Sequence, residues 1–182
     1  MTPIEFQRKL EAKIADLNTA KLIFPAAQET HRRLIKRLFD EGEGAQGKLG
    51  KYSTDAQYFT KKQFKNKGAF KAKGKTGKTK FENGEPHQSM YLEQGYQELK
   101  QIQGYESSFV NLTYSSDLRN DFSTGMVIKG DKVFAMVKRA INSDKVGWLS
   151  DKYGDKTFKH TEEEKTFFRT EVSRELVNYF TN

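Results

Sequence analysis

Lysine side chains are the chemically most distinctive residues of this 182-residue chain, because nine of them fall within residues 61–80, a stretch without any acidic residue. Ammonium groups at this density can neutralise several phosphates, and such binding ignores base sequence and weakens with salt. Lysine lacks the planar fork with which arginine reads a base edge. We call residues 61–80 the lysine segment. Its candidate contacts to DNA or to a partner protein are Lys61, Lys62, Lys65, Lys67, Lys71, Lys73, Lys75, Lys78 and Lys80.

The charge outside the lysine segment is balanced. The net charge of +8 reflects 32 Lys and Arg against 24 Asp and Glu, and without the segment 23 basic residues face 24 acidic ones. This distribution indicates one place where the fold meets a polyanion or an acidic protein, rather than a wholly basic surface. A solvated stretch that only limits aggregation is the remaining interpretation.

Two partial nucleotide-binding motifs occur in unsuitable contexts. Gly42, Gly44 and Gly47 fit G-x-G-x-x-G but follow a predicted helix, whereas a dinucleotide site needs them between a strand and a helix. Gly74 and Gly77 each precede Lys-Thr as in a phosphate-binding loop, but the glycine required five positions upstream is alanine in both cases. We therefore expect no nucleotide cofactor.

The other titratable side chains form no catalytic pattern. His31, His87 and His160 lack metal-ligand spacing, and we expect them at the surface or at helix caps. Asp117 and Asp121 lie in a polar turn, where carboxylates usually accept from backbone N–H groups. The chain has no cysteine, which excludes thiolate chemistry and disulfides. We expect no catalytic residue, no metal site and no cofactor, and so a protein that is not an enzyme.

The first 39 residues are predicted to be helical. Apolar residues recur at helical spacing, Thr2 and Pro3 fit a helix start, and Pro25 should kink the helix or split it. Residues 42–88 lack apolar periodicity and are rich in glycine and lysine. We predict one domain over residues 1–182, with residues 42–88 as a long loop insertion.

Regular structure is predicted again from residue 89. The pattern favours a helix that Gly104 ends, a strand over 109–114, a polar turn or single helical turn over 115–123, and a hairpin of 126–128 with 133–139. A short helix should follow over 144–153, and Thr161 with Glu164 fits the capping box of a C-terminal helix. The fold class is therefore α+β, with a small antiparallel sheet flanked by N-terminal and C-terminal helices.

Several segments resemble the neck and tail-completion proteins of tailed bacteriophages, which act in virion morphogenesis. The family runs a Leu-Arg segment into a hairpin, then an Asn…Trp…Tyr-Gly segment, then a Phe before an acidic helix start. The corresponding segments here are VNLTYSSDLR at 110–119, NSDKVGWLSDKYG at 142–154, FKHTEEE at 158–164 and REL at 174–176, with RLFDEG at 37–42 and GKYST at 50–54 as the opening. The Ala-Arg-Pro-Phe segment of many relatives keeps only its aromatic residue, Phe158.

The resemblance implies a structural virion protein, assembled in the host cytoplasm, that forms a ring of a half-dozen or a dozen copies in the neck. Such a ring joins the portal, its adaptor or the head-closure protein to the tail tube or the tail terminator. Genomic DNA in the channel is a further implied partner. The lysine segment of each copy in the ring could contact this DNA weakly, and the contacts of all copies would add up.

Subunit contacts in such a ring need two different patches on each copy. Our candidates are Lys129 and Lys132 at the hairpin tip, and Phe167 and Phe168 in the C-terminal helix. The alternative function is a nucleic-acid-binding domain that acts through the lysine segment alone. No stretch of the sequence approaches 18 consecutive apolar residues, so we expect no membrane span.

Overall fold

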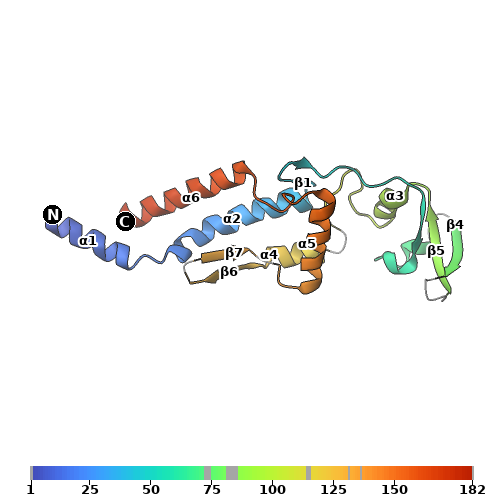
Figure 1. The fold of residues 1–182 in the computed structure, drawn as a ribbon, viewed down its shortest axis with the longest axis horizontal. Helices are drawn as coiled ribbons and strands as arrows, with labels where there is room; N and C mark the ends of the chain where they lie inside the picture. The colour runs from blue at the N-terminus through green and yellow to red at the C-terminus, as the bar shows by residue number, and fades with distance from the viewer. Residues whose placement is uncertain are drawn as a thin grey trace. The chain divides into compact units, whose positions relative to one another are not determined.

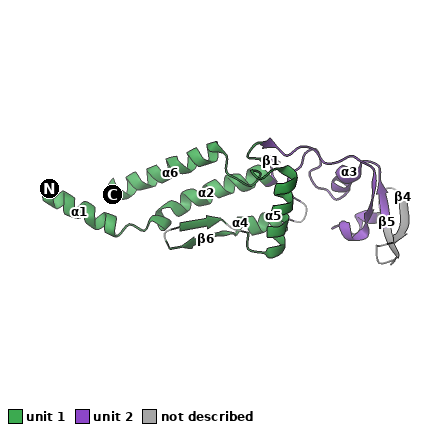
Figure 2. Ribbon diagram, viewed as in Figure 1, with its two compact units in different colours: residues 1–38, 44–46, 117–182 green, residues 39–43, 47–116 purple. Residues whose placement is uncertain are grey.

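The computed structural model describes residues 2–71, 75–80, 86–113, 116–130, 132–135 and 137–181, with only the backbone described at 71, 75–80 and 86–88. The chain divides into two compact units (Figure 2). Unit 1 comprises residues 1–38, 44–46 and 117–182, and unit 2 comprises residues 39–43 and 47–116. This division differs from the single domain that the length suggests.

Unit 1 is mainly helical (Figure 1). Its elements are α1 (Pro3–Ala15), α2 (Thr19–Phe39, whose last residue belongs to unit 2), α4 (Asp117–Ser123), β6 (Met126–Lys129), β7 (Lys132–Ala135), α5 (Ala140–Tyr153) and α6 (Glu162–Thr181).

The helical N-terminal region is confirmed, but its break does not fall at Pro25. Pro25 lies inside α2, and the chain leaves the helix at residues 16–18 instead. The Asn18 Oδ1 accepts a 2.9 Å hydrogen bond from the Lys21 N–H, which caps the start of α2. At the start of α1, the Glu5 N–H donates to Thr2 Oγ1 at 3.2 Å and the Thr2 N–H donates to Glu5 Oε2 at 2.6 Å.

The buried apolar side chains of unit 1 lie mainly on α2 and α4. Ala26, Leu34 and Leu38 are separated by eight and four residues, so they share one face of α2. On α4, Phe122 is buried and stacks on His31 of α2, with ring centroids 6.2 Å apart. The short α4 is therefore held against the middle of α2.

The predicted hairpin is confirmed, although its second strand is shorter than expected. β6 and β7 pair antiparallel, with Met126 opposite Ala135 and Lys129 opposite Lys132. β7 ends at Ala135, and the N–H groups of Lys138 and Arg139 donate to the Asp121 carboxylate instead of to a strand partner. Neither strand has a buried residue.

Unit 2 contains a three-stranded antiparallel sheet in the order β3–β5–β4. Phe59 of β3 and Thr76 of β4 both lie opposite Met90 of β5. The two-residue strands β1 and β2 lie where the chain passes between the units. The elements are β1 (Glu43–Gly44), β2 (Gly47–Lys48), β3 (Gln57–Thr60), the 3₁₀ turns η1 (Lys61–Gln63) and η2 (Ala69–Lys71), β4 (Lys75–Lys80), β5 (Pro86–Leu92) and α3 (Gly95–Ile102).

The prediction of a continuous loop over residues 42–88 is therefore wrong. This stretch supplies the strands of unit 2 and much of its core, in which Phe59, Phe64 and Phe70 are buried with Met90 and Leu99. Single phenylalanines separated by lysines and glycines give no period of 2 or 3.6, yet each one removes a large apolar surface from water. The core is built from isolated aromatic anchors rather than from a periodic face.

Two further sequence predictions for unit 2 need correction. Residues 109–113 are not a strand in the structure, and Leu112 has a φ of +49°, which breaks any extended run. The helix predicted from residue 89 divides into the end of β5 and α3. Gly95 marks this junction with a φ of +50°, and a Cβ there would lie 2.1 Å from the Asp55 carbonyl oxygen.

The C-terminal part of the chain forms the predicted helices. α5 begins at Ala140, earlier than expected, and ends at Tyr153, followed by the cap residue Gly154, whose φ is +99°. The Glu164 N–H donates to Thr161 Oγ1 at 3.1 Å, which confirms the cap of α6. The α+β class with helices at both ends is confirmed. Among the described residues, no helix is long and apolar enough to cross a bilayer.

Candidate functional site

The first part of the lysine segment presents exposed ammonium groups on a fixed backbone. Lys61, Lys62, Lys65 and Lys67 are exposed. The Lys67 Nζ donates to the carbonyl oxygens of Lys61 and Lys62 at 2.9 and 3.4 Å, and the Lys65 N–H donates to Gln103 Oε1 at 2.6 Å. These bonds hold the turn that includes η1, so the four positive charges are gathered on one ordered stretch of unit 2.

The phenylalanines between these lysines are not available to stack on bases. Phe64 is 0% exposed and Phe70 is buried, and their rings meet edge to face with centroids 5.2 Å apart. The exposed aromatic side chain nearby in the sequence is Tyr58 of β3, whose ring lies against Tyr91 at 5.0 Å. The described part of this surface can therefore attract phosphate by charge, without a stacking platform of phenylalanines.

The remaining candidate lysines lie in η2 or β4, or outside the residues that the structure describes. Lys71 ends η2, while Lys75, Lys78 and Lys80 belong to β4, opposite Tyr91, Gln88 and Pro86 of β5. Lys73 lies outside the described residues. The structure thus places three of these lysines on a paired strand.

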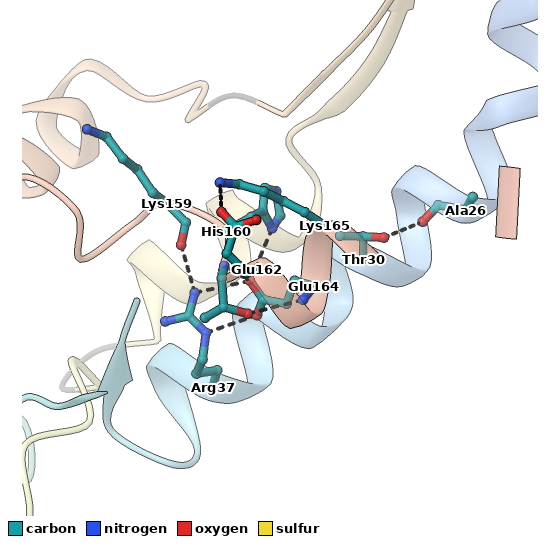
Figure 3. Close-up of polar contacts among 9 residues, drawn as sticks. Ala26, Thr30, Arg37, Lys159, His160, Glu162, Glu164 and Lys165 are labelled. Atoms are coloured by element: carbon teal, nitrogen blue, oxygen red, sulfur yellow. Dashed lines mark hydrogen bonds and ion pairs between the residues drawn. The ribbon is translucent and has the colours of Figure 1, made fainter. Parts of the chain in front are cut away.

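A buried ion pair that the sequence analysis missed joins α2 to α6 in unit 1 (Figure 3). The Arg37 Nε donates to Glu164 Oε1 at 2.9 Å, and one terminal nitrogen donates to Glu164 Oε2 at 3.3 Å and to the Lys159 carbonyl at 2.9 Å. Both side chains are less than a tenth exposed. The capping box identifies Glu164 from the sequence, but nothing in the sequence points to Arg37 as its partner.

The Glu164 carboxylate is ionised by its surroundings. Burial opposes the charge, but hydrogen bonds from His160, from Arg37 and from the Thr161 N–H outweigh it and lower the pKa of Glu164 to about 2. The His160 Nδ1 lies 3.3 Å from Glu164 Oε2. All these partners are used in holding the carboxylate, so the cluster is organised as a structural joint.

A second carboxylate, Asp121 of α4, holds the start of α5. Its two oxygens accept from the N–H groups of Lys138 and Arg139 at 3.1 and 3.0 Å, and from Asn142 Nδ2 at 3.0 Å. Burial opposes the charge on Asp121, and these hydrogen bonds lower its pKa below the usual value. The prediction that this carboxylate serves backbone donors is confirmed. The Asn142 Nδ2 also lies 3.4 Å from the Asp117 carbonyl oxygen.

The three histidines are in different environments. His31 is buried, which contradicts its expected surface or cap position, and its Nε2 lies 2.7 Å from the Phe122 carbonyl oxygen. Burial lowers the pKa of His31 and favours the neutral ring. His160 precedes α6 and contacts Glu164, consistent with a cap position. The side chain of His87 is outside the description.

Among the side chains of unit 2 that the structure describes, the lysine Lys100 of α3 is buried and only 1% exposed. Its Nζ donates to the Thr113 carbonyl and lies 4.9 and 5.3 Å from the ring centroids of Tyr52 and Tyr105. Burial lowers the pKa of Lys100 to about 8, although the charge of Glu106 opposes this shift. The only sequence signal is its position four residues after Tyr96 on the buried face of α3.

The predicted subunit contacts lie in two kinds of surroundings. Lys129 and Lys132 are exposed at the end of the β6–β7 ladder, as expected for a hairpin tip. Phe167 is partly buried, and the Arg33 guanidinium lies 3.6 Å from its ring centroid, so this ring already packs against α2. Phe168 is also partly buried.

Unit 1 exposes several other large apolar side chains. α1 carries Phe6, Leu10 and Ile14, and none of its residues is buried. Trp148 of α5 is 66% exposed, and Phe134 of β7 is also exposed. An isolated two-stranded hairpin and a helix without buried residues gain little from their own fold. These elements therefore keep large apolar side chains in contact with water.

Among the described residues, no group of three or more His, Asp or Glu side chains is arranged to hold a metal ion. Comparisons of the chain with family models, with curated proteins and with solved structures return no match. The arrangement described above can present charge from unit 2 and apolar surface from unit 1.

Proposed function

We propose that the chain is a non-enzymatic structural subunit of a tailed-phage neck, where copies form a ring that joins the head-closure complex to the tail. The observation that carries this proposal is the apolar surface of unit 1. Large apolar side chains on α1, β7 and α5 face solvent in a chain whose mean hydropathy is −0.84. Such surfaces are typical of subunits that bind other proteins.

The segments that carry the family resemblance also support this proposal. The opening segment at 37–42 and the segment at 158–164 meet through the buried pair of Arg37 and Glu164. The segments at 110–119 and 142–154 meet where Asn142 approaches the Asp117 carbonyl oxygen. In both places, residues that carry the resemblance join one element to another, which supports a structural role.

The experiment is deletion of the gene in the phage that encodes it, followed by negative-stain electron microscopy. The expected result is DNA-filled heads separated from complete tails, restored to joined virions by the wild-type gene supplied in trans. Joined, infectious particles in the deletion strain would overturn the proposal.

A second candidate function, sequence-independent DNA binding, is favoured by the exposed charges of Lys61, Lys62 and Lys65. Each phosphate contact contributes about 0.9 to the slope of log affinity against log salt. Replacing these three lysines with Gln should weaken duplex DNA binding and reduce that slope. The matched control is Lys129→Gln with Lys132→Gln, which removes exposed charge from unit 1. An unchanged slope in the first variant would exclude this surface as a DNA contact.

A further inference from the structure

Two exposed apolar stripes run along helices of unit 1. On α1, Phe6, Leu10 and Ile14 follow one another at intervals of four residues and are 57%, 37% and 55% exposed. On α5, Ile141 and Trp148 are seven residues apart and are 55% and 66% exposed. Both spacings place the side chains on one face of their helix. We call these the α1 stripe and the α5 stripe.

The helices that carry the two stripes, α1 and α5, lie at opposite ends of unit 1 (Figure 2). α1 precedes the first turn of α2, and its Lys13 Nζ donates to the Tyr179 carbonyl near the end of α6 at 3.2 Å. α5 is anchored to α4 through Asn142 and Asp121, and α4 packs at the middle of α2. The two stripes of one copy are therefore carried by helices that are attached to different parts of unit 1 and are free to meet another copy.

We propose that the α1 stripe of one copy packs against the α5 stripe of the next copy, with the two helices antiparallel. The inference rests on the proposed ring, and it identifies the patches that meet. Because the two patches differ, the contact is heterologous, as ring closure requires.

The charges beside the stripes favour this pairing and set its direction. At 3.6 residues per turn, Lys9 flanks one side of the α1 stripe, next to Lys13, whose ammonium already donates to the Tyr179 carbonyl of the same copy, while Glu11 flanks the other side. On α5, Asp144 and Asp151 flank the corresponding side, and Lys145 and Lys152 flank the opposite side. When the helices are antiparallel, the basic edge of α1 meets the acidic edge of α5, and Glu11 meets lysine. A parallel arrangement would place lysine against lysine.

The stripes are short, so a single contact between two of them should be weak. Phe6 to Ile14 spans about 12 Å and Ile141 to Trp148 about 10 Å, at 1.5 Å per residue, so the stripes match in length. Two helical turns bury less than the roughly 1,200 Å² of a stable interface. One contact should therefore be transient in solution, and closure of the ring should multiply its effect.

The test uses disulfide cross-linking, which is clean because the chain has no cysteine. Leu10→Cys protein is mixed with Trp148→Cys protein at high concentration under mild oxidation, and the disulfide-linked dimer is measured. The matched control pairs Leu10→Cys with Val177→Cys, because Val177 is a comparably exposed apolar residue outside both stripes. We expect at least a fivefold higher yield in the Leu10–Trp148 mixture. Equal yields would overturn the inference.

A charge exchange tests the direction of pairing. Added to the cysteine variants, Lys9→Glu or Asp151→Lys alone should reduce the cross-link yield at least twofold, and the two together should restore it. No loss from either change, or no restoration, would overturn the antiparallel arrangement. Circular dichroism checks that each exposed-site variant remains folded.

If cross-linking fails while the deletion strain shows separated heads and tails, the inference falls and the neck function stands. Joined virions in the deletion strain would reject the neck function, whatever the cross-link yield.

Discussion

Unit 1 and unit 2 differ in where they place several of their aromatic and charged side chains. Unit 2 buries Phe59, Phe64 and Phe70 and exposes the lysines between them. Unit 1 exposes Phe6 and Trp148 and buries an arginine–glutamate pair. A unit that keeps aromatic rings inside is stabilised by its own core, whereas one that leaves them outside retains surface for another protein. The comparison predicts that each unit responds to different substitutions.

The largest expected effect is loss of the central ring of unit 2. Phe64→Ala should destabilise unit 2 by about 4 kcal/mol, because a fully buried phenylalanine leaves a cavity. Hydrogen exchange followed by mass spectrometry should show faster exchange in β3 and β5 and unchanged exchange in α2 and α6. Phe134→Ala, which removes an exposed ring from unit 1, is the control. Equally faster exchange in both units would contradict their independence.

Breaking the buried ion pair should affect unit 1. Arg37→Met leaves the Glu164 carboxylate buried without its cation and should cost about 3 kcal/mol, read from denaturant midpoints and exchange in α6. Adding Glu164→Leu should recover most of that loss, because the lone charge is then removed. Lys159→Met breaks the exposed pair with Asp155 and should cost less than about 0.5 kcal/mol. A double variant no more stable than Arg37→Met would argue against an uncompensated charge as the cause.

Lys100 should make the stability of unit 2 change with pH in the alkaline range. Its folded pKa of about 8 lies below the usual lysine value of 10.5, so the unfolded chain binds more protons between these pH values. Stability of the wild type should therefore rise from pH 8 towards pH 10 relative to Lys100→Met. Hydrogen exchange of the β5 amides, followed as a function of denaturant concentration at each pH, measures this difference in stability. The control is Lys62→Met, which replaces an exposed lysine of the same unit. This variant should show the same rise in stability with pH as the wild type.

The smallest expected effect concerns the exposed lysines. Lys61→Gln and Lys65→Gln should each change stability by less than about 0.5 kcal/mol, because both side chains lie at the surface. Thermal unfolding at low and high salt measures this. A loss above about 1 kcal/mol in either variant would mean that the lysine is part of the fold of unit 2.

The elements of unit 1 could be predicted because they follow simple periodic rules. Helical spacing, the Thr161–Glu164 cap and the β-branched hairpin identify them without tertiary information. Unit 2 could not be predicted in this way. Phe59, Phe64 and Phe70 form a core only together with Met90, which β5 brings beside them from a distant part of the sequence. Arg37 and Lys100 were missed for the same reason. Their partners, Glu164 and the Thr113 carbonyl, are fixed by the fold and not by neighbouring residues in the sequence.

The position of Trp148 gives the molecule its own optical reporter. It is the chain's single tryptophan, and its indole is largely hydrated in the free subunit. Its fluorescence emission should therefore lie at long wavelength when copies are apart and shift towards the blue when a neighbouring helix covers it. Association could then be followed in real time in unlabelled protein, by exciting Trp148 at a wavelength that the eight tyrosines do not absorb.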